Sequence, residues 1–71
     1  MTTPTTFQLA NDWTLSPHAF KAVVLAFNNT EAAAELLTGM TVDEYSDLAE
    51  EDEDEPLVAT FYFAMNPDLI V

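Results

Sequence analysis

The chain has 71 residues, of which 13 are Asp or Glu and one is Lys or Arg, so its formal net charge is −12 at pH 7. This length allows one small domain, residues 1–71, and a hydrophobic share of 49% is too high for a disordered chain. The charge argues against direct binding to nucleic acid or to an anionic membrane, and the absence of cysteine excludes disulfides and Cys-based zinc sites.

The N-terminal stretch "MTTPTTFQLAND" contains no Lys or Arg and no long apolar run. We therefore expect no signal peptide and a cytoplasmic protein without a membrane span. Within this stretch, residues 5–10 predict a short strand, because Phe7 and Leu9 alternate with Thr6, Gln8 and Ala10.

Two amphipathic helices are predicted next. The first begins with Ser16 as the N-cap and Pro17 at the first helical position, and it ends at Asn28 and Asn29. The second is capped by Thr30 and ends at Gly39, the one glycine of the chain.

A third helix opens with Thr41 and Glu44, which have the spacing of a capping box. It runs toward the acidic stretch "EEDEDE" at residues 50–55. Residues 49–55 either continue this helix or form a flexible loop, because runs of like charge resist folding. In the helical alternative, carboxylates recur roughly every 5–6 Å along one stripe, formed by Asp43, Asp47, Glu50 or Glu51, and Asp54.

The stretch "LVATFYFAM", residues 57–65, predicts a strand because it is aromatic, partly β-branched and free of Gly, Pro and charge. Both of its faces are apolar, so we expect cover on both sides or pairing at a dimer interface. Residues 66–68 predict a turn, after which residues 69–71 dock onto the core. The predicted fold class is α+β, with two or three short helices packed on a small antiparallel sheet formed by the N-terminal and C-terminal strands. A homodimer or a partner would complete such a sheet, because two strands alone are marginally stable.

No motif for catalysis or cofactor binding is present. Asp12, Ser16 and His18 are triad residue types, but they cluster around one predicted helix start, which favours a helix cap beside a surface histidine. A single glycine excludes a phosphate-binding loop, and the acidic run lacks the EF-hand pattern. We therefore expect no enzyme, no catalytic residue, no cofactor and no metal site.

The acidic residues are concentrated rather than spread, since nine of the thirteen fall between positions 43 and 55. With its short length, its charge, the stretch "DLAEEDEDE" and no catalytic motif, the chain resembles the small acidic inhibitors that phages and other mobile elements encode. DNA-mimic and anti-CRISPR proteins belong to this group. The resemblance implies a stoichiometric blocker of a nucleic-acid-binding protein, acting in the host cytoplasm if the chain is phage-encoded.

The predicted function is thus a non-enzymatic inhibitor whose acidic surface occupies the nucleic-acid site of a basic protein. Trp13 is an additional aromatic that could anchor such an interface. Two alternatives stay open: an antitoxin-like or regulatory module that binds a dedicated basic partner, and a small structural protein of a halophile. The predicted partner-binding residues are Asp43, Glu44, Tyr45, Asp47, Glu50, Glu51, Asp52, Glu53, Asp54 and Glu55.

Overall fold

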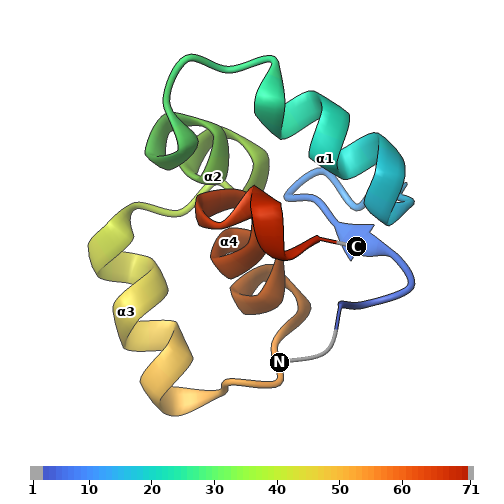
Figure 1. The fold of residues 1–71 in the computed structure, drawn as a ribbon. Coiled ribbons are helices and arrows are strands. Elements are labelled where there is room, and N and C mark those ends of the chain that lie inside the picture. The colour runs from blue at the N-terminus through green and yellow to red at the C-terminus, as the bar shows by residue number, and fades with distance from the viewer. Residues whose placement is uncertain (1–2, 71) are drawn as a thin grey trace.

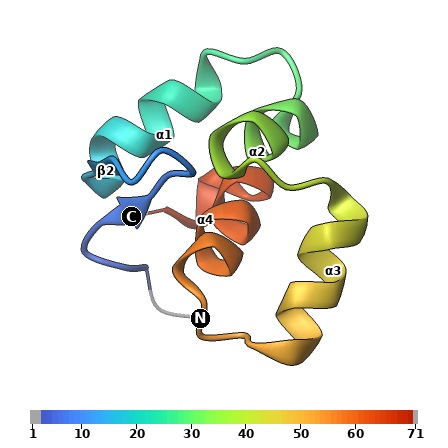
Figure 2. The same cartoon turned by 180° about the vertical axis from the view of Figure 1, so that it is seen from behind.

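A central apolar helix organises the computed structural model, which describes residues 3–70. This helix, α4, lies in the middle of the molecule, and α1, α2 and α3 surround it (Figures 1 and 2). The broad class is α+β, as predicted, but residues 3–70 hold four α-helices rather than two or three. The elements in chain order are β1 (Phe7–Gln8), β2 (Thr14–Leu15), α1 (Pro17–Leu25), α2 (Thr30–Thr38), α3 (Val42–Glu51), α4 (Pro56–Met65) and the 3-10 helix η1 (Pro67–Leu69).

The strand predicted over residues 57–65 is wrong, because this stretch forms α4. Pro56 occupies the first turn of the helix, where its missing N–H is not needed. A helix that is covered on every side has no polar face, so its sequence shows no helical period and resembles a buried strand. The expectation of cover on both sides was correct; its fully buried residues are Val58, Thr60, Phe61, Phe63 and Ala64.

The predicted sheet between the two ends of the chain is also wrong, since both strands are N-terminal. β1 pairs antiparallel with β2, and Phe7 lies opposite Leu15. The strand predicted over residues 5–10 shortens to Phe7–Gln8. Asp12 has a φ of 68°, a left-handed conformation that Asp tolerates better than most residues, and it turns the chain back toward β2. Because residues 57–65 are helical, β1 has no C-terminal strand to pair with.

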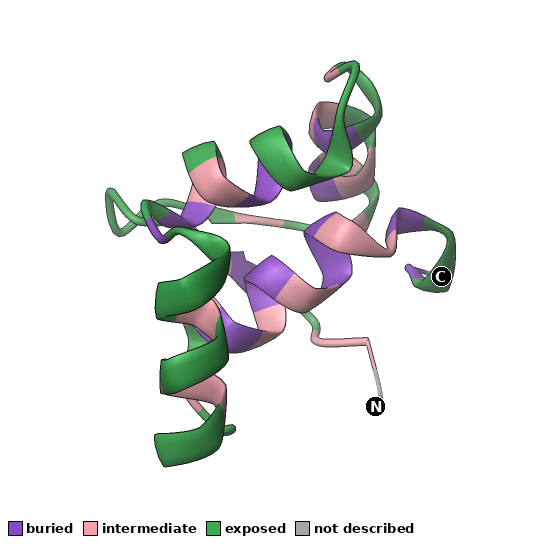
Figure 3. Cartoon of the chain, turned by 90° about the vertical axis from the view of Figure 1, so that its left-hand side faces the viewer, coloured by how far each residue is buried: buried purple, intermediate pink, exposed green. Residues whose placement is uncertain are grey.

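Aromatic rings join the hairpin to the helices in the core. The rings of Phe7 and Phe20 stack with centroids 4.2 Å apart, and Phe63 meets Phe7 edge-on at 5.6 Å. These rings link β1, α1 and α4 into one cluster with the buried face of α2. The burial colouring in Figure 3 shows this inner layer and also shows that α3 lies outside it. In agreement, no residue of α3 is fully buried.

Three predicted helix boundaries are confirmed by their local hydrogen bonds or backbone angles. The Ser16 hydroxyl accepts from the Ala19 N–H at the start of α1. Gly39 ends α2 with a φ of 69°, a left-handed conformation that favours glycine. At the start of α3, Thr41 and Glu44 form both hydrogen bonds of a capping box.

Other boundaries differ from the prediction. The first helix ends at Leu25, before the predicted stop at residues 28–29, and Asn29 caps α2 in place of Thr30. The turn predicted at residues 66–68 is the 3-10 helix η1, after which Ile70 is buried while Leu69 is exposed. Val71, predicted to dock with them, lies outside the described residues. Among residues 3–70, no helix combines the length and the apolar character needed to cross a bilayer.

Candidate functional site

The acidic side chains of α3 and of the loop that follows it form the most highly charged part of the molecule. All of them are exposed except Glu55, which is half-buried. In Figure 3, α3 stands at the edge of the fold with exposed residues along its outer side. We call this set the acidic face: Asp43, Glu44, Asp47, Glu50, Glu51, Asp52, Glu53, Asp54 and Glu55.

An apolar stripe holds α3 against the core and thereby orients the acidic face. Tyr45, Leu48 and Ala49 are half-buried, and their spacing places them on one side of the helix. The Tyr45 ring stacks on Phe61 of α4, with centroids 4.3 Å apart and planes 11° from parallel. Tyr45 was predicted to bind the partner, which remains a prediction; part of its surface is taken up by this stack.

The opposite side of α3 presents carboxylates to solvent. Asp43, Asp47 and Glu50 recur at i, i+4 and i+7, so they lie along one line of the helix surface. A rise of about 1.5 Å per residue separates their positions by roughly 4.5–6 Å along the axis. The helical part of the predicted acidic stripe is therefore present.

The end of α3 resolves the two alternatives for residues 49–55. The helix ends at Glu51, with Asp52 as its C-cap, and a four-residue stretch at 52–55 leads into α4. The Asp52 carboxylate accepts a hydrogen bond from the Asp54 N–H at 3.3 Å, which turns the chain out of the helical path. Asp54 is therefore not on the helical stripe, and that part of the prediction is wrong.

Two acids of the acidic face also have local structural roles. The Glu44 carboxylate accepts from the Thr41 N–H at 3.1 Å, as the second half of the capping box. Asp52 holds the turn just described. A carboxamide at either position would keep an oxygen acceptor while removing the charge.

Two of these nine acids lie where their charge opposes folding, whereas Asp43 and Glu44 lie in the first turn of α3, where the helix dipole favours negative charge. Glu50 and Glu51 occupy the last turn of α3, which contains no basic residue, and the C-terminal end of a helix dipole disfavours negative charge. The one basic side chain of the chain is on another element: Lys21 of α1 donates from Nζ to the Ile70 carbonyl at 3.3 Å. Among residues 3–70, the fold therefore places no Lys or Arg side chain at the end of α3.

No protein-family model, curated protein or solved structure matches this chain. The chemistry of the side chains is then the basis for assigning a role to the acidic face.

Within residues 3–70, no group of three or more His, Asp or Glu side chains is gathered closely enough to hold a metal ion. The residues of the rejected triad have other positions: Ser16 caps α1, Asp12 forms the hairpin turn, and His18 is exposed.

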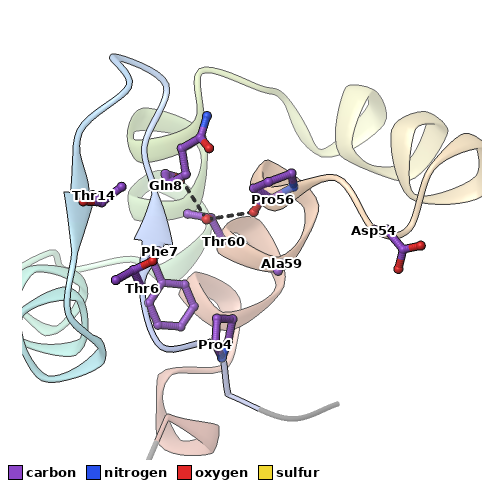
Figure 4. Close-up of a pocket in the computed structure, with 9 residues that line it drawn as sticks. All are labelled: Pro4, Thr6, Phe7, Gln8, Thr14, Asp54, Pro56, Ala59 and Thr60. Carbon is purple, nitrogen blue, oxygen red and sulfur yellow. Dashed lines mark hydrogen bonds between the residues drawn. The ribbon is translucent and has the colours of Figure 1, made fainter.

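Two further features bear on recognition. Trp13 is 69% exposed, as expected of a candidate anchor, but it belongs to the hairpin rather than to α3. The second feature, which sequence reasoning missed, is a pocket of about 340 Å³ beside the acidic loop, with Asp54 in its lining (Figure 4). A pocket of this kind is assembled from distant segments, so no local pattern predicts it.

The Tyr45 hydroxyl should make the stability of the fold sensitive to alkaline pH. Burial, and secondarily the nearby Tyr62, raise the pKa of Tyr45 above its ordinary value. The folded chain therefore keeps this proton at a pH where the unfolded chain loses it, so stability falls as pH rises above about 10. Urea unfolding measured from about pH 9 to pH 11 should show this fall, and Tyr45→Phe should reduce it. An identical pH profile for the variant would contradict the assignment.

Proposed function

We propose that this chain is a non-enzymatic inhibitor whose acidic face occupies the nucleic-acid-binding site of a basic target protein, in the manner of a DNA mimic or anti-CRISPR protein. One observation carries the proposal: nine acids gather on α3 and its loop, including positions where their charge opposes folding. Natural sequences depart from locally favourable choices mainly at functional sites. A charge that served only solubility would not need to be concentrated there.

The geometry of α3 supports mimicry of a phosphate backbone. Its exposed carboxylates are spaced by roughly 4.5–6 Å along a straight element, and one DNA strand presents a phosphate about every 3.4 Å. Lys and Arg side chains arranged to hold phosphates could form charge-assisted hydrogen bonds with these carboxylates. The net charge of −12 would also accelerate the encounter with a basic protein.

The proposal predicts that position, not total charge, decides binding. The face variant Asp43→Asn, Asp47→Asn, Glu50→Gln removes three charges from α3. The matched control Asp12→Asn, Glu31→Gln, Asp68→Asn removes three exposed charges from the hairpin, α2 and η1. Both triples remove acids from first turns of helices, Asp43 of α3 in the face variant and Glu31 of α2 with Asp68 of η1 in the control, so both lose helix-dipole stabilisation.

The immobilised wild-type chain and both triple variants would be exposed to lysate of the source organism and of its host. Retained proteins are released by salt or by added DNA or RNA and identified by mass spectrometry. We expect a nucleic-acid-binding protein on the wild type and the control, bound roughly 3- to 150-fold more weakly by the face variant. Capture of a basic protein that nucleic acid does not displace would favour a dedicated partner instead. Unfolding of the wild type at low salt would favour the halophile alternative.

A further inference from the structure

A pocket of about 340 Å³ lies next to the acidic loop, where β1 and the segment before it meet the first turns of α4. Figure 4 shows Gln8 and Thr60 beside each other in the pocket and Asp54 at its far end, on the loop that enters α4. The pocket thus adjoins the acidic face directly. Its lining consists of Pro4, Thr6, Phe7, Gln8, Thr14, Asp54, Pro56, Ala59 and Thr60.

Within the described part of the chain, residues 3–70, the lining combines apolar surface with oxygen acceptors and includes no basic side chain. Two prolines, Phe7 and Ala59 supply the apolar part, while Thr6, Thr14 and Gln8 supply neutral oxygens. Asp54 adds a negative charge at the rim. Such a lining suits a side chain with an apolar stem and a cationic end.

The hydrogen bonds around Thr60 make the pocket unsuitable for an added β-strand. The Thr60 hydroxyl is fully buried and lies 2.9 Å from the Gln8 carbonyl and 3.0 Å from the Pro56 carbonyl, so its proton serves these two acceptors. The outward carbonyl of Gln8, to which a new strand would bond, is therefore already occupied. A side chain can enter this pocket, whereas a peptide backbone would compete with Thr60.

We propose that this pocket receives an arginine side chain of the basic target and fixes the target's position on the acidic face. This proposal rests on the proposed function and adds the kind of residue that is recognised. The guanidinium has five N–H donors and is weakly hydrated, so it suits a partly apolar, acceptor-lined pocket better than the ammonium of lysine. Asp54, flanked in sequence by Glu53 and Glu55, supplies the complementary charge.

The pocket can be tested without the target by NMR titration with N-acetyl-arginine amide. The matched neutral probe is N-acetyl-citrulline amide, which has a similar shape and no charge. We expect saturable shifts of the Gln8, Ala59 and Thr60 amide signals with the arginine probe, and binding at least about fivefold weaker with citrulline. Equal shifts with both probes, or arginine shifts confined to α3, would overturn the proposal.

Two variants make the titration specific. Ala59→Leu narrows the pocket with three added carbon atoms, leaves the charge unchanged and keeps a good helix former in α4, so it should clearly weaken the arginine-induced shifts. Asp54→Asn should weaken arginine binding about threefold, and it leaves the backbone hydrogen bond to Asp52 in place. If Ala59→Leu fails to fold, Asp54→Asn still tests the proposal. Arginine binding by Asp54→Asn that equals the wild type would contradict the role of the Asp54 carboxylate.

The captured target separates this proposal from the proposed function. Ala59→Leu should weaken target binding about tenfold. The dependence of target affinity on salt concentration should stay the same as in the wild type. If Ala59→Leu binds the target with wild-type affinity while the face variant binds weakly, the proposal that the pocket receives an arginine is wrong. The proposed inhibitor function would then still hold. A target that nucleic acid does not displace would overturn the inhibitor function, and the arginine titration would still test the pocket.

Discussion

Replacing Phe61 with alanine is expected to lower the free energy of unfolding by about 3–5 kcal/mol. Phe61 is 1% exposed, and its ring joins the inner core to α3 through the stack with Tyr45. A domain of this length has a total stability of only roughly 4–10 kcal/mol. The variant should therefore lose about a third or more of its stability, which urea titration followed by circular dichroism at 222 nm would measure.

The matched control for Phe61→Ala is Leu36→Ala on α2. Leu36 is 69% exposed, so its truncation should change the free energy of unfolding by less than about 0.5 kcal/mol. A loss at Phe61 as small as that at Leu36 would mean that α4 does not occupy the centre of the fold.

Replacing Tyr45 with alanine is expected to weaken target binding at least about tenfold while the net charge stays unchanged. Among the half-buried side chains that hold α3, Tyr45 makes the aromatic contact to α4, so its truncation should loosen the helix from the core. Binding would then have to order the helix, and fixing the backbone of even one residue costs about 1–2 kcal/mol. The target affinity would be measured by titration calorimetry after capture.

Tyr45→Phe is the control for this effect, because it retains the stacked ring and removes only the hydroxyl. It should bind the target within about twofold of the wild type. Equal affinity of Tyr45→Ala and the wild type would show that the acids act as a flexible tail, for which the order of α3 is irrelevant. Weak binding by both variants would instead assign the Tyr45 hydroxyl a direct contact with the target.

The sequence predicted local features of this fold better than long-range ones. The cap at Ser16, the stop at Gly39 and the capping box at Thr41 and Glu44 each depend on residues within one turn, and the structure contains all of them. Pro56 carries a further local signal, because proline is common at the first position of a helix, and it stands there in α4.

The conformation of residues 57–65 could not be read from the pattern of apolar residues. Phe61, Tyr62 and Phe63 favour strands when they stand on a half-buried surface. In this molecule α1, α2, α3 and β1 supply cover from several directions, and tertiary packing decides in favour of the helix (Figures 1 and 2). Once this segment is helical, the predicted terminal sheet cannot form, so both long-range errors have one cause.

The candidate site was predictable in position but not in shape. The clustering of acids at residues 43–55 identified the acidic face, and the i, i+4 spacing of Asp43 and Asp47 placed them on one helical line. The end of α3 at Glu51 depends on the turn at Asp52, for which a uniform run of acids gave no signal. The predicted topology placed the N-terminal strand beside residues 57–65 as a strand pair, whereas the adjoining pocket depends on the hairpin meeting these residues as a helix.

The absence of any fully buried residue in α3 has a consequence for how such a protein can evolve. Core packing constrains Tyr45, Leu48 and Ala49 within the helix, while most other positions face solvent. Mutations can therefore rearrange the charges along α3 with little effect on folding of the inner layer. Proteins with this fold could adapt to a changed binding partner through substitutions at the exposed positions of α3 alone. The buried layer beneath the helix would stay unchanged.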